Sequence, residues 1–271
     1  MLRRRPASLV IALLAVLSAA PAASADTQYG GSGLYKGKAV ASPSITLTLR
    51  DDGTAAARVA FAYSCRRVAN FSFVMRLTGR VQGSSFTVTG RTRTRGLGTI
   101  RVSLRGTATP ADATGNARVR VPGCKGYTNP FVVRTESAPA GAPAAPAPGT
   151  LAQGFTSQSA AAFRMPVALR VAGNGRVYAR WGAVLTCGRV KVPMVDVTPT
   201  RAIKPDGTFG GSETYTIRYR GYSERYRVTF RGQFLADGVK GTLRATMRAR
   251  RNGRALVPCR TGAHTWTARA T

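Results

Sequence analysis

Apolar and polar residues alternate along most of the chain with a period of two. The segment 45–50 reads Ile-Thr-Leu-Thr-Leu-Arg, and the segment 59–63 reads Val-Ala-Phe-Ala-Tyr. Such alternation predicts half-buried strands, because successive side chains of a β-strand point to opposite faces of its sheet. No stretch after residue 25 has sustained helical periodicity. We therefore expect an all-β, antiparallel protein.

Two-residue turn signals separate the alternating segments. Asp52-Gly53 stands between the segments quoted above, and Asn174-Gly175 stands at the matching place in the second half of the chain. Both dipeptides are typical of type I′ hairpins, in which both central residues have positive φ. The spacing of such turns predicts six to eight short strands in each half.

The second half of the chain repeats the first. A shift of 122 residues lays Cys65 on Cys187, and a shift of 126 lays 101–106 on 227–232. A repeated unit of this length is a folding unit. We expect two β-domains, 26–136 and 150–271, each an antiparallel β-sandwich, with a small up-and-down β-barrel as the alternative.

A proline- and alanine-rich segment, 137–149, separates the two repeats and reads Ser-Ala-Pro-Ala-Gly-Ala-Pro-Ala-Ala-Pro-Ala-Pro-Gly. Frequent proline removes backbone donors and favours extended polyproline conformations. The sequence therefore predicts a semi-rigid linker here.

The first 25 residues have the pattern of a secretory signal peptide. Three arginines are followed by an apolar run from Leu9 to Leu17 and by small residues that end at Ala25. We expect cleavage after Ala25 and a secreted, extracellular protein. No later segment approaches the roughly 20 apolar residues of a transmembrane helix, so we expect no membrane span.

Four cysteines in an exported chain predict disulfides, because the compartment is oxidising. Four cysteines allow three pairings. The duplication favours Cys65 with Cys124 and Cys187 with Cys259, so that each repeat has its own bridge. Metal ligation is disfavoured because neither repeat contains a CxxC pair or a Cys/His cluster. We expect no metal site and no cofactor.

The layout of each repeat resembles a secreted bacterial β-domain of unknown function. In that pattern a hairpin runs to a first cysteine, and the domain closes with a motif like Cys-Arg-Thr-Gly at 259–262 and Trp-Thr-Ala-Arg at 266–269. In the first repeat only Cys124, Gly126 and Phe131 match this ending. The resemblance implies a duplicated, disulfide-bonded all-β protein and implies no activity.

The chain is strongly basic, with a formal net charge of +31. Removing the three arginines of the leader leaves +28, of which the first repeat carries +12 and the second +16. A surplus of this size draws a protein to polyanions. Arginine supplies 35 of the 41 basic residues, and a GC-rich bacterial genome also produces an arginine-rich composition without any binding role.

Arginines recur at alternate positions of the predicted strands. In Ile-Arg-Val-Ser-Leu-Arg at 100–105 and in the matching 226–231 segment, the arginines occupy one face and the apolar residues the other. Like charges on neighbouring strands repel, and a counter-anion would relieve them. We expect a face for an anionic polymer: a cell-wall polymer, an acidic polysaccharide or extracellular nucleic acid. Its candidate residues are Arg91, Arg93, Arg101, Arg105, Arg118, Arg120, Arg218, Arg220, Arg227, Arg231, Arg244 and Arg248.

Catalytic chemistry has little support in the sequence. The one histidine, His264, has no Ser/His/Asp or Cys/His arrangement around it. A carboxylate pair of the glycosidase type is conceivable among five acids of the second repeat, namely Asp196, Asp206, Glu213, Glu224 and Asp237. We expect no enzyme; the alternatives to a polymer-binding protein are a structural or spacer protein without a specific ligand and, third, a carbohydrate-active enzyme.

Aromatic side chains are a second candidate surface, because they stack on sugars. The period of two places Trp181, Trp266, Tyr215 and Tyr226 on apolar faces, which predicts that they belong to the core. Tyr222 stands at a turn, and we expect it to be the most exposed of the tyrosine cluster.

Overall fold

The structure is a computed structural model that describes residues 26–36, 39–65, 68–94, 98–219 and 221–270. Side chains are described for these residues except 39, 62–65, 68–72, 199–201 and 219. The predicted signal peptide, 1–25, lies outside the described residues. The first repeat contains β1 (Thr27–Tyr35), β2 (Ala39–Leu49), β3 (Thr54–Cys65), β4 (Val68–Gln82), β5 (Ser85–Thr94), β6 (Gly98–Ala108), β7 (Asp112–Arg120) and β8 (Tyr127–Arg134).

The second repeat consists of a further nine strands. They are β9 (Leu151–Ala160), β10 (Phe163–Val171), β11 (Arg176–Cys187), β12 (Val190–Ala202), β13 (Thr208–Tyr219), β14 (Tyr222–Leu235), β15 (Gly238–Arg251), the two-residue β16 (Arg254–Ala255) and β17 (Cys259–Ala270). The all-β expectation is confirmed. In the part of the chain that the structure describes, no helix is long and apolar enough to cross a membrane.

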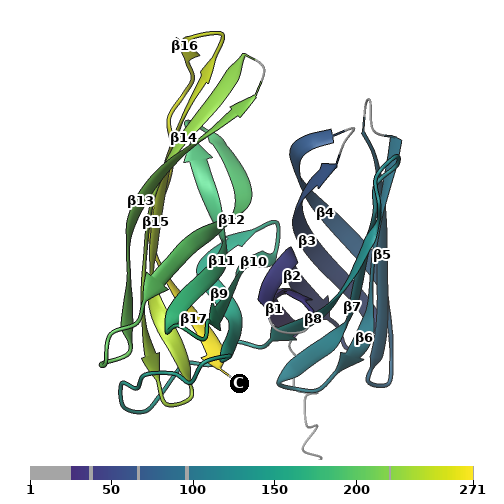
Figure 1. Ribbon diagram of the computed structural model, residues 1–271. Helices are drawn as coiled ribbons and strands as arrows, with labels where there is room; N and C mark the ends of the chain where they lie inside the picture. The colour runs from purple at the N-terminus through teal and green to yellow at the C-terminus, as the bar shows by residue number, and fades with distance from the viewer. Residues whose placement is uncertain (1–25, 37–38, 66–67, 95–97, 220, 271) are drawn as a thin grey trace, which may run out of the picture.

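The first repeat is a closed barrel in which every strand pairs antiparallel with its neighbours in the sequence (Figure 1). The barrel closes where β1 pairs with β8, with Gly33 opposite Phe131. For this repeat the alternative of an up-and-down barrel is correct and the sandwich is wrong. The reason is that short hairpins keep each strand beside its predecessor, so no connection crosses from one sheet to another.

The second repeat has the same strand order in a single sheet, β12-β11-β10-β9-β17-β15-β14-β13. Its first strand, β9, pairs with its last, β17, as β1 pairs with β8 in the first repeat. An additional pairing of β11 with β17 closes a smaller ring of four strands. The two repeats therefore share one order of strands, as expected for a duplication, but the second sheet is open between β12 and β13, where the first repeat pairs β4 with β5.

The predicted hairpins occur where expected, but their turn type differs. In the first, Gly53 has φ 75° and its N–H donates to the carbonyl of Arg50 at 3.1 Å. Asp52 is not among the described residues with positive φ, which a type I′ turn would require. Gly175 and Gly207 make the same contacts in their own loops. Each loop is a three-residue connection that ends in a left-handed glycine, so the type I′ prediction was wrong.

Each repeat has its own apolar core. The first core gathers the inward residues of all eight strands, with Phe61, Leu77 and Phe131 among the most deeply buried. The second is built around Trp181 and Trp266, whose side chains are 0% and 1% exposed. This confirms that both tryptophans belong to the core.

Cys187 and Cys259 form a disulfide, as predicted. They are register partners where β11 pairs with β17, so the bridge fastens the four-strand ring. Cys124 is also disulfide-bonded. Its predicted partner, Cys65, lies where side chains are not described.

The predicted linker, 137–149, lies against the second repeat. The N–H of Ala140 donates to the Asp237 carboxylate at 2.7 Å, and the N–H of Ala144 donates to the carbonyl of Phe234 at 3.2 Å. Its proline-rich backbone is thus held along the loop between β14 and β15, while most of its residues are exposed.

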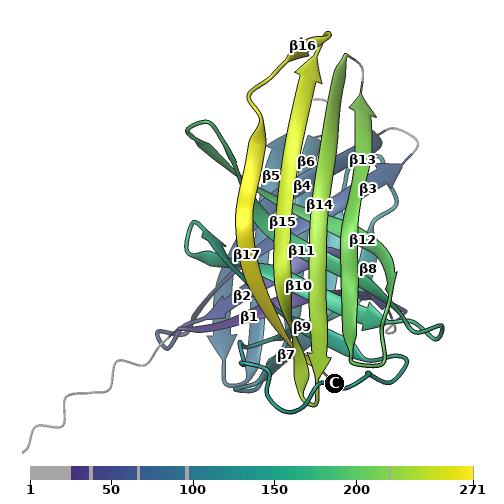
Figure 2. The same cartoon turned by 90° about the vertical axis from the view of Figure 1, so that its left-hand side faces the viewer.

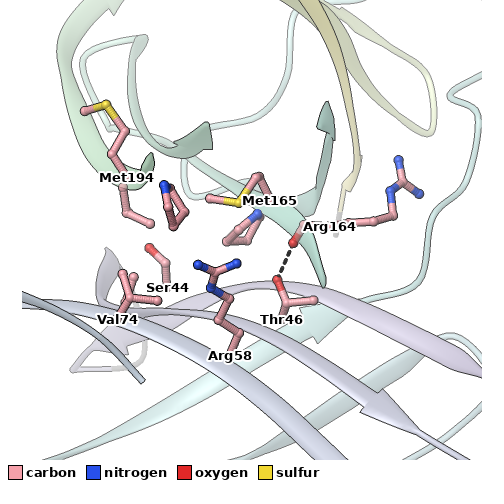
Figure 3. Close-up of a pocket in the computed structure, with 11 residues that line it drawn as sticks. Ser44, Thr46, Arg58, Val74, Arg164, Met165 and Met194 are labelled. Atoms are coloured by element: carbon pink, nitrogen blue, oxygen red, sulfur yellow. Dashed lines mark hydrogen bonds between the residues drawn. The ribbon is translucent and has the colours of Figure 1, made fainter. Parts of the chain in front are cut away.

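The two repeats pack against each other through faces that mix polar side chains with apolar ones such as Val74 and Met165. On one side stand β1, β2 and β3, and on the other β9, β10, β11 and β12. Hydrogen bonds cross this contact: Thr46 Oγ1 donates to the carbonyl of Arg164 at 2.7 Å, and Arg58 Nη1 donates to that of Ala160 at 2.8 Å. Figure 3 shows Arg58 and Thr46 rising from the first repeat toward Arg164. The cavity between them measures only about 10 Å³, which is too small for more than one water molecule.

Candidate functional site

Three arginines form a row across neighbouring strands of the first repeat. Arg91 on β5 is the register partner of Arg101 on β6, and Arg101 is the partner of Arg120 on β7. All three are exposed, because the alternate residues of these strands fill the barrel core. Neighbouring strands lie about 4.8 Å apart, so the three side chains leave the surface within about 10 Å of one another.

The row belongs to a larger face, which we call the first arginine face. It consists of six exposed arginines on β5, β6 and β7: Arg91, Arg93, Arg101, Arg105, Arg118 and Arg120. A shallow groove of about 640 Å³ runs over the outer side of β4 to β7, and four arginines of this set line it. All six were candidates from the sequence, and the structure brings them together on one side of one barrel.

The second repeat carries an equivalent surface, the second arginine face. Arg225 on β14 and Arg248 on β15 are register partners, and Arg227 stands two residues further along β14. Arg225, Arg227 and Arg248 line a groove of about 550 Å³. The full set is exposed and comprises Arg218, Arg225, Arg227, Arg231, Arg244 and Arg248.

Two acids, Glu213 and Glu224, lie near the second arginine face, and Glu213 is half-buried and lines its groove. Glu224 lies between Arg225 and Ser223 in the sequence, yet it points inward and accepts hydrogen bonds from the hydroxyls of Tyr222 and Tyr226 at 3.0 and 2.7 Å. Among the described residues, the ion pairs join other arginines, Arg50, Arg134 and Arg164, to acids. Within the described part of the chain, no arginine of either face forms an ion pair with a carboxylate.

One predicted residue lies outside the described part of the chain, and two residues of the arginine faces or their grooves were overlooked. Arg220 lies outside the described residues, so its place in the second arginine face is not described. Arg225 was not a candidate from the sequence, although it shares the alternation of Arg227 and Arg231 and could have been found from it. Arg76 on β4 was also overlooked; it lines the groove of the first face and lies 5.9 Å from the ring centre of Phe163 in the other repeat.

A different set of arginines serves the contact between the repeats. Arg58, Arg134 and Arg180 each donate a hydrogen bond across it, Arg180 Nε to Ser44 Oγ at 3.1 Å and Arg134 Nη1 to the carbonyl of Arg269 at 3.1 Å. Burial lowers the pKa of all three guanidinium groups. The basic residues thus divide into a buried set that joins the repeats and an exposed set that faces solvent.

The five acids considered for catalysis also divide into two groups. Asp206 accepts from the N–H and hydroxyl of Thr208, and Asp237 accepts from Ala140, so both stabilise loops. Asp196, Glu213 and Glu224 lie close enough for their charges to interact. The pKa of Asp196 is raised to about 6, mainly by burial and also by the charges of Glu213 and Glu224. The N–H of Val197 and the charge of Arg180 partly offset this rise.

Histidine and tyrosine contribute little to an exposed site. A ring nitrogen of His264 contacts the carbonyl of Thr261. Among the described residues, no group of three or more His, Cys, Asp or Glu side chains is placed to hold a metal ion. Tyr226 is buried and Tyr215 stacks on it at 5.1 Å, as expected for core residues. Tyr222 is half-buried and donates to Glu224, so none of the tyrosines of the cluster whose side chains are described is fully exposed.

No protein-family model matches the chain, and neither does any curated protein. Among solved structures, the chain is similar to one from Bacteroides fragilis NCTC 9343 that is described as a candidate outer membrane protein. The match covers 90% of this chain and 95% of that one, at 11% identity and a TM-score of 0.25. A likeness at this level carries no argument, so function has to be argued from the residues of this chain.

Proposed function

We propose that this is a secreted, non-catalytic protein that binds anionic polysaccharides of the cell envelope or extracellular matrix through its two arginine faces. The observation that carries this proposal is the register of Arg91, Arg101 and Arg120. Three like charges stand side by side on adjacent strands without a protein carboxylate among the described residues to pair with them. Such an arrangement costs free energy in the isolated protein, and a polyanion offsets that cost.

The chemistry of the side chains supports carboxylate, sulfate or phosphate as the ligand group. A guanidinium is planar and donates two parallel hydrogen bonds to such anions, which an ammonium cannot do. Both faces consist of arginine on rigid strands, and each has a shallow open groove that suits an extended chain better than a small molecule. The disulfide Cys187–Cys259 is typical of an exported protein, which would meet such polymers.

Nucleic acid is the less favoured polymer. Single-stranded nucleic acid is usually held by aromatic side chains on which bases stack. The exposed large apolar residues of the described chain include two aromatic ones, Tyr35 and Tyr178, and neither belongs to the strands of the arginine faces. A surface that offers only charge recognises a polymer by its anionic groups, so the binding of duplex DNA has to be measured as well.

The experiment is a binding screen with the mature protein, residues 26–271. The panel contains heparin, polygalacturonate, long-chain polyphosphate, duplex DNA and neutral dextran, which separate sulfate, carboxylate and phosphate from an uncharged polymer. We expect binding to the two acidic polysaccharides and none to dextran. Binding to duplex DNA alone would replace the polysaccharide with nucleic acid as the ligand. Absence of binding to every polyanion at low salt would leave a structural protein without a specific ligand as the better account.

A further inference from the structure

The contact between the repeats lies at one side of each barrel. Its central strands are β2 in the first repeat and β10 in the second, flanked by β1 and β3 and by β9 and β11. The contact is fixed by hydrogen bonds with buried partners: Gln153 and Ser32 are both 0% exposed, and the N–H of Ser32 donates to Gln153 Oε1 at 3.0 Å. The two barrels are therefore held in one orientation.

The arginine faces are centred on strands away from this contact, and only the β4 edge of the first groove reaches it, through Arg76. In a ring of eight strands that follow the sequence, the strand four places on stands across the barrel, so β6 lies opposite β2. The sheet of the second repeat is open, and β14 lies outside its four-strand ring; along the sheet, β9, β17 and β15 separate β14 from β10. Arg101 and Arg105 stand on β6, and Arg225, Arg227 and Arg231 stand on β14.

Two views of the molecule show the strands of the two arginine faces on its opposite outer sides. Figure 1 shows β5 and β6 at one outer side of the pair of barrels and β13 and β15 at the other. After the quarter turn of Figure 2, the strands β13, β14 and β15 face the viewer, and β4, β5 and β6 lie behind them. The two arginine faces thus point away from each other, with both barrels between them.

We infer that one molecule of this protein bridges two anionic polysaccharide chains, one on each arginine face. This inference rests on the proposed function. A single short chain cannot contact both faces, because it would have to pass around both barrels. Two sites on a flexible linker would instead favour one chain by raising the effective concentration at the second site. The fixed contact between the repeats removes that option and makes the protein a cross-linker.

A two-chain capture assay tests the inference. Heparin is immobilised on a surface, the protein is bound to it, and fluorescent heparin is then added in solution. The first-face variant is R91E/R101E/R120E, and the second-face variant is R225E/R227E/R248E. We expect wild-type protein to capture fluorescent heparin. Either variant should still bind the surface through its intact face but capture no more fluorescence than a surface without protein.

A matched control carries the same change of charge elsewhere. R189E/K191E/R254E reverses three exposed cations outside both faces and should capture like wild type. Wild-type protein that binds the surface but captures no second chain would overturn the inference and leave the proposed function standing. Capture that persists in both single-face variants would also overturn it. Failure of wild-type protein to bind the surface at all would instead contradict the proposed function.

Discussion

The backbone of Gly30 on β1 stands so close to that of Gly154 on β9 that no side chain fits between them. A Cβ atom built on Gly30 would lie 2.4 Å from the carbonyl oxygen of Gly154 and 2.5 Å from the ring of Phe155. The first strands of the two repeats therefore meet backbone to backbone. This approach, with the buried bond from Ser32 to Gln153 beside it, fixes one barrel on the other.

Substituting Gly30 tests whether this contact holds the repeats together. Gly30→Val would force the two backbones apart, and we expect a larger radius of gyration in small-angle X-ray scattering with both barrels still folded. Gly173→Ala is the control, because a Cβ there meets nothing within 4 Å. An unchanged radius of gyration for Gly30→Val would show that the barrels are not joined by this contact.

Each repeat should fold without the other. The two cores share no residues, although the contact between the barrels also buries apolar side chains such as Phe155 and Met165. We expect residues 26–136 and 150–271, expressed separately under oxidising conditions, to give cooperative melts with β-type circular dichroism. Both should melt below the full chain, because each loses the hydrogen bonds that cross the contact. If both fragments were unfolded alone, the repeats would not be independent folding units.

Removing the Cys187–Cys259 bridge should destabilise the second repeat. In the chain-entropy model, a bridge between residues 72 apart contributes about 4 kcal/mol to the free energy of unfolding. We expect C187S/C259S to lower the urea midpoint followed by tryptophan fluorescence. That signal reports on the second repeat alone, because the chain has two tryptophans and both lie in its core. Equal midpoints for variant and wild type would mean that the ring formed by β11 and β17 does not depend on its bridge.

The raised pKa of Asp196 predicts a pH dependence of stability. Its pKa is about 6 in the folded protein, mainly through burial, against about 3.9 for an unfolded Asp. Between these values the folded state binds more protons than the unfolded state, so the free energy of unfolding should fall as pH rises from about 4 to about 6. Above pH 6 this contribution should be constant.

Asp196→Asn should remove that fall and make the protein more stable than wild type at pH 7. An asparagine keeps an oxygen that can accept from the N–H of Val197, as Asp196 does at 2.7 Å. Thermal melts from pH 4 to pH 7 measure the effect, and Asp51→Asn, in an exposed turn, is the control. A wild-type melting temperature that rises through this range, with no change in the variant, would contradict the stated environment of Asp196.

The period of two in the sequence predicts most of the strands, because burial inside a barrel forces strict alternation of apolar and polar residues. It also predicts that Arg101, Arg105, Arg227 and Arg231 face outward. The same pattern cannot separate a sandwich from a barrel, since both have one buried and one exposed face. That choice depends on whether β1 reaches β8, which is a contact between strands far apart in the sequence.

The contact between the repeats could not be predicted from the sequence. Arg58, Arg134 and Arg180 occur in strands with the same alternation as the exposed arginines, and only the packing of two barrels shows that they are buried. Gln153 and Thr46 look like outward polar residues of ordinary strands for the same reason. The hydrogen bonds of the proline-rich segment to Asp237 and Phe234 could not be predicted either, because they depend on the loop against which it lies.

The salt dependence of heparin binding is the most direct test of whether the two arginine faces bind a polyanion. The dissociation constant of fluorescent heparin is measured from about 50 to about 200 mM NaCl, because charge-driven binding to a polyelectrolyte weakens steeply over this range. The proteins compared are wild type, the first-face and second-face variants, and the control R189E/K191E/R254E. We predict a linear fall of the logarithm of affinity with the logarithm of salt, a shallower slope for each face variant, and a wild-type slope for the control. Equal slopes for all four proteins, or no binding at the lowest salt, would contradict binding through the arginine faces.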